Sequence, residues 1–318
     1  MAGDTLKILG KEIKRGKSAF LELEIAKLHT RTPIKIPVIV NRSKYDGPTI
    51  LLMAGVHGDE INGVAIVREI IKKEYNKPDC GTIICIPVLN VFGYLNQKRA
   101  FPDGRDLNRM FPGSLQGSLA SQFAYTFRKE IVPLVDYVID FHTGGASREN
   151  MAQVRCVFTD DKALELAKVF CAPFIVHSEN ISKSVRETVN KLGKTILLFE
   201  GGKSKHIDQQ VIDYGVKGAY NVMKHIGILK GETDTTTKPI LIKKSKWVRA
   251  LYSGMFKAVA ANGSKVQKGG VIGYILDPYG EFEKKVKAPF DGYIFCVNNA
   301  PVVNKGNALF HISTEEIA

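Results

Sequence analysis

A histidine and a glutamate three residues apart, His57 and Glu60, lie in the glycine-rich segment 55–60. An imidazole nitrogen and a carboxylate oxygen are both ligands that a zinc ion accepts. Pairs at this spacing also occur by chance, most often in a solvated loop or a helix cap. The pair therefore predicts a metal site only if other parts of the chain supply a third ligand, a general base and groups that hold a substrate.

Two further polar side chains, His142 and Glu200, directly follow apolar runs that predict buried strands, as the His57 segment does. These runs are residues 49–53, 135–141 and 195–199. If the three strands are parallel, the four side chains meet at the carboxyl edge of the sheet, where open α/β sheets bind ligands. Two histidines and a carboxylate leave zinc a fourth position for water. The alternatives are a hydrogen-bonded histidine at a strand end and a carboxylate at a helix N-terminus.

The elements that must position these residues alternate between strands and helices. The predicted strands are residues 18–26, 35–40, 49–53, 81–88, 135–141 and 195–199. The predicted helices are residues 61–71, 119–131, with Ser118 as N-cap, 161–170, 184–192 and 209–226. This alternation predicts an α/β fold with a mixed, mostly parallel sheet flanked by helices. The irregular segment 90–117 is long for a connection, which favours a functional loop.

The chain changes character after residue 230. A polar linker, residues 231–239, leads into short segments with Gly and Pro turns, which predict a smaller all-β domain. Two half-repeats, residues 253–270 and 290–307, resemble the barrel-sandwich fold of lipoyl and biotinyl carrier domains. The turn between them lacks a lysine, so a role in shaping the active-site mouth or an oligomer contact is favoured. We predict a catalytic domain at 1–230 and a β-rich, barrel-sandwich-like domain at 240–318.

Composition excludes several classes of function. The 318 residues, 44% of them hydrophobic, can bury a large core, and no apolar run is long enough to span a membrane. Five cysteines without CxxC spacing, and an N-terminus (residues 1–5) unlike a signal peptide, predict a cytoplasmic protein. The net charge of +13 is spread thinly, without interleaved aromatic residues. We therefore expect a small anionic partner and no nucleic acid or membrane, and we leave a homo-oligomer open.

The long loop contains GRDLNRMFPG at residues 104–113. The planar guanidinium of Arg109 can hold a carboxylate through two parallel hydrogen bonds, and Asn108 can donate beside it. Loop arginines are more often solvated than functional, so this segment alone predicts little. Its value depends on the other three segments.

Together, four segments resemble the succinylglutamate desuccinylase/aspartoacylase family, part of the wider zinc carboxypeptidase-like group. They are GVHGDE at 55–60, DLNRMFPG at 106–113, DFH at 140–142 and EGG at 200–202. The resemblance covers residues 45–230 in the right order, and four linked motifs are more specific than one. It implies a zinc carboxypeptidase-like fold and a hydrolase with one Zn²⁺ ion that cleaves the amide bond of an N-acyl amino acid.

The resemblance also implies a role for each site residue. The metal ligands are His57, Glu60 and His142, and Glu200 is the general base and then the general acid. Asn108 and Arg109 hold the α-carboxylate, and Arg186 contacts a carboxylate on the substrate side chain. Arg99, with Arg105 as the alternative, polarises the carbonyl that is attacked. The chemistry is consistent, because zinc lowers the pKa of bound water to about 7.

Two other functions stay open at this point. A metallocarboxypeptidase acting on peptide C-termini would use the same residues. A non-catalytic protein could hold an anion with the same groups at the strand ends, without a metal. The deacylase is the leading hypothesis, because it is the activity that the resemblance implies.

Overall fold

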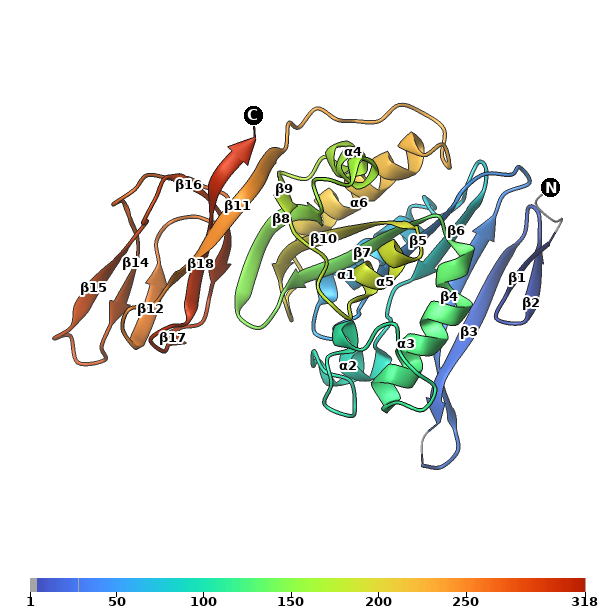
Figure 1. Ribbon diagram of the computed structural model, residues 1–318, viewed down its shortest axis with the longest axis horizontal. Helices are drawn as coiled ribbons and strands as arrows, with labels where there is room; N and C mark the ends of the chain where they lie inside the picture. The colour runs from blue at the N-terminus through green and yellow to red at the C-terminus, as the bar shows by residue number, and fades with distance from the viewer. Residues whose placement is uncertain (1–4, 28, 318) are drawn as a thin grey trace.

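The structure is a computed structural model that describes residues 5–27 and 29–317 (Figure 1). Twelve strands of this part of the chain form one sheet. Across the sheet they are β13 (Lys265–Val266), β16 (Gly292–Asn298), β18 (Ala308–Ile317), β11 (Ile240–Arg249), β9 (Phe174–His177), β8 (Arg148–Cys156), β10 (Thr195–Lys203), β7 (Tyr137–Gly144), β5 (Thr49–Ala54), β6 (Thr82–Ile86), β4 (Pro33–Arg42) and β3 (Ser18–Lys27). The sheet therefore continues from the region of the four motifs into the C-terminal strands.

The sheet contains two groups of parallel strands, which an antiparallel pairing joins and further antiparallel pairings flank. The strands β10, β7, β5 and β6 are parallel neighbours, and so are β8, β9 and β11. The pairings β8–β10, β6–β4 and β4–β3 are antiparallel, as are those among the C-terminal strands. The predicted mixed sheet is confirmed. Parallel pairing does not predominate over the whole sheet, because a hairpin and a run of C-terminal strands add antiparallel pairs that need no crossover helix.

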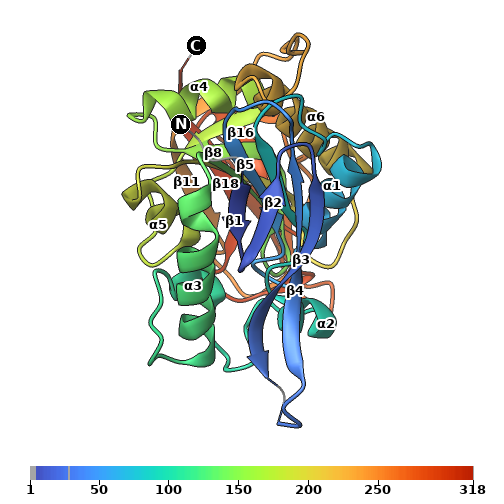
Figure 2. The same cartoon turned by 90° about the vertical axis from the view of Figure 1, so that its right-hand side faces the viewer.

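Helices cover both faces of the central strands. The first face carries α1 (Ile61–Lys72), α4 (Asp161–Phe170) and α6 (Gln209–His225), and the second carries α3 (Leu119–Glu130) and α5 (Val185–Lys191). Figure 2 shows α3 and α5 on the side of the sheet opposite α1 and α6. Side chains alternate along a strand. Ile50 and Leu52 of β5 therefore pack in the first layer, and Leu51 and Met53 pack in the second.

Most elements lie where the sequence predicts them. The five predicted helices are confirmed to within one residue at each end, and Ser118 caps α3 by accepting a hydrogen bond from the Ser121 N–H. The segment 90–117 is less irregular than predicted. It contains the short helix α2 (Val91–Asn96) and the 3₁₀ turn η1 (Leu107–Arg109). The strands β8 and β9 were not predicted.

The C-terminal part contains a second sheet that is entirely antiparallel. Its order is β15 (Glu283–Lys287), β14 (Val271–Leu276), β12 (Gly254–Ala258) and β17 (Val302–Val303). Buried Phe256, Ile275 and Phe310 belong to one apolar core between this sheet and the strands β16 and β18. The predicted all-β character is confirmed. In Figure 1 these strands, orange to red, lie beyond β8 and β9, to which β16 and β11 are hydrogen-bonded.

A separate hairpin consists of β1 (Thr5–Ile8) and β2 (Lys11–Lys14). Among the helices of the described residues, none has the length and apolar character to cross a membrane. The five cysteines are free thiols. Residues 1–4, which belong to the segment compared with signal peptides, lie outside the described residues, as do residues 28 and 318 of the two predicted domains.

Candidate active site

The turn between β5 and α1 carries His57 and Glu60. The Glu60 N–H donates to the carbonyl oxygen of His57 at 3.2 Å, and α1 begins at the next residue. A Cβ atom on Gly58 would lie 1.8 Å from the carbonyl carbon of Gly93 in α2. Only glycine therefore fits where α2 crosses the turn. The two functional side chains are 3% and 2% exposed, so the turn holds them inside the protein.

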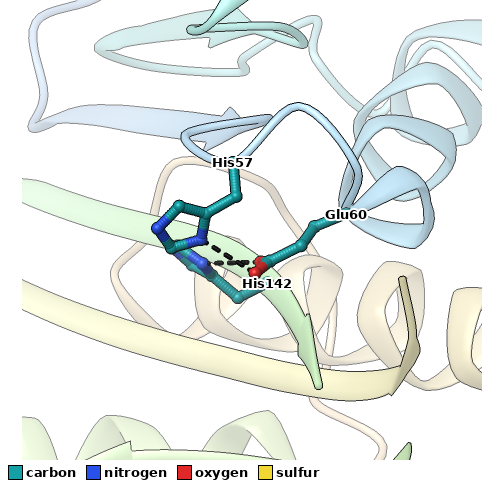
Figure 3. A group of neighbouring side chains, drawn as sticks. All are labelled: His57, Glu60 and His142. Carbon is teal, nitrogen blue, oxygen red and sulfur yellow. Dashed lines mark hydrogen bonds and ion pairs between the residues drawn. The ribbon is translucent and has the colours of Figure 1, made fainter. Parts of the chain in front are cut away.

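His57, Glu60 and His142 converge on one point (Figure 3). Nδ1 of His57 lies 2.8 Å from Oε1 of Glu60, and Nδ1 of His142 lies 2.8 Å from Oε2. Their ligand atoms are all within 4.8 Å of one another. The backbone N–H of Thr143 donates to Oε2 at 3.1 Å and helps to orient the carboxylate. The structure therefore brings together the three residues expected to be metal ligands.

The outer nitrogen of each imidazole contacts a further carboxylate. Nε2 of His57 lies 3.1 Å from Oδ1 of Asp106, and Nε2 of His142 lies 2.9 Å from Oδ2 of Asp140. Asp106 also accepts hydrogen bonds from Nε and Nη2 of Arg99, at 3.1 and 2.9 Å. Histidine ligands commonly have such a partner, which fixes the ring and increases the basicity of the other nitrogen. The two Nδ1 atoms are then left to face a cation.

The buried charges of this group stabilise one another. Burial alone would raise the pKa of Glu60, but the charges of His57 and His142 outweigh it and hold that pKa well below its usual range. Burial would lower the pKa of His142, but Asp140 and Glu60 outweigh it and raise that pKa well above its usual range. Glu60 and Asp106 raise the pKa of His57 in the same way. The site favours positive charge beside Glu60, which a zinc ion supplies when it displaces the protons, so these residues fit zinc.

Glu200 lies on β10, next to His142 on β7. The two residues are register partners in the parallel pairing. Both lie within their strands, and not directly after them as predicted, because β7 and β10 continue beyond them. Nδ2 of Asn150 donates to Oε2 of Glu200 at 2.5 Å, and Nη1 of Arg155 lies 3.6 Å from Oε1. Two residues of β8 therefore orient the Glu200 carboxylate.

Asn150 and Arg155 were missed by sequence reasoning. Both lie on β8, the antiparallel neighbour of β10, and β8 itself was not predicted. The signal that could have revealed the strand is the alternation of Ala152, Val154 and Cys156, all buried, with polar residues between them. Recognising that strand would have added its polar side chains to the list of candidates.

A cavity of about 310 Å³ opens beside the metal group and Glu200. The residues expected to meet the substrate all line it, namely Arg99, Asn108, Arg109 and Arg186. Arg105, the alternative to Arg99, is not among the lining residues, and its guanidinium lies 3.7 Å from Asp103 with 52% of the side chain exposed. The structure therefore brings Arg99, and not Arg105, into the cavity.

The groups on one side of the cavity are held in place by hydrogen bonds. Oδ1 of Asn108 accepts from the Val185 N–H at the start of α5, at 2.9 Å. Nη1 of Arg109 donates to the Asn108 carbonyl oxygen at 2.7 Å. The buried Arg186 donates through Nη2 to Oγ of Ser178 at 3.0 Å. The long loop and α5 thus form one part of the cavity lining.

The C-terminal strands also contribute to the lining. Trp247 of β11, Cys296 of β16 and His311 of β18 all line the cavity. None of the three was a predicted site residue, because no motif marks them. Their position agrees with the expectation that the C-terminal part shapes the mouth of the site.

Comparisons with known proteins agree with this geometry. The sequence pattern of the succinylglutamate desuccinylase/aspartoacylase catalytic domain matches residues 46–226. The N-alpha-acetyl-L-2,4-diaminobutyric acid deacetylase of Halomonas elongata is 29% identical over 290 residues, which cover 87% of this chain and 84% of that protein. The matched regions include the metal group and Glu200.

Solved structures share the fold over almost the whole chain. A succinylglutamate desuccinylase/aspartoacylase from Rhodobacter sphaeroides is 24% identical, with a TM-score of 0.82 and 95% of both chains covered. The product-bound ectoine utilization protein EutE (DoeB) from Ruegeria pomeroyi is also 24% identical, with a TM-score of 0.83 and 94% and 95% covered. The catalytic-domain match spans more than half of the sequence, and the chain belongs to the succinylglutamate desuccinylase/aspartoacylase family.

Proposed function

We propose that the protein is a zinc-dependent hydrolase that cleaves the amide bond of a small N-acyl amino acid. The observation that carries the proposal is the presence of Glu200 beside the group of His57, Glu60 and His142 in one cavity. Two imidazoles and one carboxylate fill three positions around zinc and leave the fourth open. A carboxylate next to this position can act as the general base that hydrolysis needs.

In this proposal His57, Glu60 and His142 hold the ion. Zinc, when bound, lowers the pKa of water to about 7 and polarises the substrate carbonyl. Glu200 accepts a proton from the attacking water, whose oxygen bonds to the amide carbon. Glu200 then gives the proton to the nitrogen as the C–N bond breaks, which releases a carboxylic acid and the free amino acid.

Asn150 and Arg155 prepare Glu200 for this role. Oε2 of Glu200 already accepts the hydrogen bond from Asn150, so Oε1 is the oxygen that takes the proton. Arg155, 3.6 Å from Oε1, stabilises the ionised carboxylate before the reaction. The pair therefore fixes the position of the carboxylate and leaves Oε1 free to accept the proton.

Arg99 is our candidate for the group that stabilises the developing oxyanion. Its Nη1 lies 3.2 Å from Oε1 of Glu60, so a positive charge is fixed at the edge of the metal group. Asp106 holds the guanidinium from the other side. Charge aimed at the carbonyl oxygen before the reaction begins is commonly the largest contribution to catalysis. Arg99 lines the cavity and Arg105 does not, which supports the choice of Arg99.

The charges around the cavity support an anionic substrate. The lining contains five arginines, which are Arg99, Arg109, Arg148, Arg155 and Arg186. Its acidic residues are Glu60 and Glu200, both of which already have roles. We propose that Asn108 and Arg109 hold the α-carboxylate and that Arg186 meets a second acidic group. The Halomonas elongata relative is named for an amino acid with a second amino group, for which this lining offers no acidic partner.

The size of the cavity favours this function over a metallocarboxypeptidase. A volume of about 310 Å³ is at the lower end of ligand pockets, which run from about 300 to 1,000 Å³. It suits a small N-acyl amino acid better than the C-terminal part of a peptide. A non-catalytic anion-binding protein would not require a carboxylate oriented beside a metal group.

Hydrolysis of a defined panel tests the proposal. The zinc-loaded protein is incubated with N-acetyl-L-aspartate, N-acetyl-L-glutamate, N-alpha-acetyl-L-2,4-diaminobutyrate and N-blocked dipeptides, and the released amine is measured. We expect release from the N-acetyl amino acids, with the two acidic ones hydrolysed fastest. Cleavage of the dipeptides alone would support a carboxypeptidase, and no cleavage by fully loaded protein would contradict a hydrolase.

A further inference from the structure

The C-terminal strands place an aromatic pair in the cavity that the motifs of the family do not include. We propose that Trp247 and His311 form an uncharged aromatic wall that contacts the acyl group of the substrate and sets the preference for acyl chains. This inference rests on the proposed hydrolysis of N-acyl amino acids. It gives the C-terminal part a direct role in choosing the substrate.

The pair is built by strand register. Trp247 on β11 and His311 on β18 are opposite one another in the antiparallel pairing. Their rings are stacked, with centroids 4.2 Å apart and planes at 13°. The ring of Phe295 lies 4.4 Å from that of His311 and supports it. Because both strands and the ring of Phe295 fix the pair, the wall has a defined position in the lining.

His311 is neutral, so the wall carries no charge. Burial, together with the nearby charges of Arg155 and Arg148, lowers the pKa of His311 to about 3. Nε2 of His311 lies 3.0 Å from Oγ of Ser245, a neutral partner. An uncharged aromatic surface favours apolar or flat groups through burial and dispersion. It supplies no charge that could pair with a second carboxylate.

The position of the wall points to the acyl group. The groups proposed to hold the amino acid come from η1 and α5, and in Figure 1 α5 and the C-terminal strands lie on opposite sides of β8. Cys296 of β16 is the register partner of both His311 on β18 and Asn150 on β8, and Asn150 donates to Glu200. The wall is therefore tied to the side of the general base. In an N-acyl amino acid the acyl group and the α-carboxylate lie on opposite sides of the scissile bond.

Two charged groups near the wall, Arg155 and Arg148, define the alternative hypothesis, in which an arginine binds the acyl group. Arg155 lies 3.6 Å from Glu200, and Arg148 donates to the Gly145 carbonyl oxygen. If one of these arginines bound the acyl group, the ligand whose acyl chain ends in a carboxylate would bind most tightly. Replacing Trp247 would then change the affinities little. The two hypotheses therefore predict different rankings of the same ligands.

Trp247 is the single tryptophan of the chain, so its fluorescence reports on the wall directly. The probes are N-acetyl-, N-propionyl-, N-butyryl- and N-succinyl-L-aspartate, added to zinc-loaded Glu200→Gln protein, in which turnover is suppressed. We expect a saturable change in emission and, for the first three probes, about fourfold tighter binding per added methylene. Free L-aspartate should bind without changing the emission. Calorimetric binding with no fluorescence change, tightest binding of the succinyl probe, or no binding of any probe would overturn the proposal.

Variants separate substrate contact from a structural effect. In Trp247→Ala the ranking of acetyl, propionyl and butyryl substrates should flatten through KM, and Trp247→Phe should restore most of it. The matched control is Tyr279→Ala, which removes an 84% exposed aromatic residue of the same domain and should leave the ranking unchanged. A lower melting temperature in Trp247→Ala with an unchanged ranking would mean that Trp247 is only structural. Acyl-dependent fluorescence without hydrolysis would instead contradict the proposed function alone.

Discussion

Glu200 and His142 are register partners on the adjacent parallel strands β10 and β7. Register partners on neighbouring strands direct their side chains to the same face, and the strands lie about 4.8 Å apart. Backbone pairing, and not a flexible loop, therefore sets the distance between the proposed base and a proposed metal ligand. The third strand, β8, completes the arrangement because its Asn150 holds Glu200.

Replacing Glu200 by glutamine tests its role as a base. Glutamine keeps the shape of the side chain and can still accept the hydrogen bond from Asn150, but it cannot take a proton. We expect kcat to fall by about 10²- to 10⁴-fold, the usual contribution of general acid–base catalysis. Steady-state kinetics and metal analysis of the same sample check this. Hydrolysis at the normal rate would remove Glu200 from the mechanism.

Replacing Asn150 by alanine should misorient the base without removing it. A hydrogen bond to a charged group contributes about 1.5–3 kcal/mol, so kcat should fall by about 10- to 100-fold. Steady-state kinetics at saturating substrate measure this loss.

The control for Asn150 is Asn299→Ala, which removes a similar Asn-to-Glu hydrogen bond, to Glu149, at an exposed site. It should leave kcat unchanged. An equal loss of kcat in both variants would indicate a general structural effect and contradict the role of Asn150.

Asp106 connects His57 to Arg99, and replacing it by asparagine should weaken metal binding. Carboxylates that orient histidine ligands typically contribute 10- to 100-fold in metal affinity. We expect a loss of this size in competition with a zinc chelator. Asp103→Asn is the matched control, because Asp103 lies on the same loop but contacts Arg105 and the Ala120 N–H. Equal zinc affinity of the Asp106 variant and the wild type would contradict the role.

Much of the fold and the metal group could be predicted from the sequence, for a physical reason. The helices have apolar residues at a regular spacing, and Ser118 marks the start of one of them. His57, Glu60, His142 and Glu200 each come after an apolar run, and the parallel pairing of these runs in β5, β7 and β10 brings the four residues together.

The remainder depends on pairing between segments that are distant in the chain. Asn150 and Arg155 reach the site only because β8 lies between β9 and β10 in the sheet. Trp247 and His311 reach the cavity only because β11 and β16 pair with β9 and β8. The sequence contains no local signal for those pairings. The division into domains 1–230 and 240–318 and a cytoplasmic location stay predictions, and a homo-oligomer stays open.

His311 predicts a specific pH dependence of stability. Its folded pKa of about 3 lies below the ordinary value of 6.5. As the pH falls below about 6.5, His311 binds a proton in the unfolded chain but stays neutral in the folded protein. The free energy of unfolding therefore falls by about 1.4 kcal/mol per pH unit until the pH nears 3. Above 6.5 the contribution is constant. Urea unfolding of wild type and His311→Phe at pH 7, 6 and 5 should show a difference that changes with pH, and a constant difference would contradict the buried, neutral state.

The most direct test of the central claim is a zinc titration of metal-free protein while hydrolysis of N-acetyl-L-aspartate is followed. The group of His57, Glu60 and His142 predicts activity that rises in proportion to added zinc and reaches a plateau at one ion per chain, with no rise in a His142→Ala variant. Hydrolysis at the full rate in the metal-free protein, or no hydrolysis at any zinc concentration, would contradict the account.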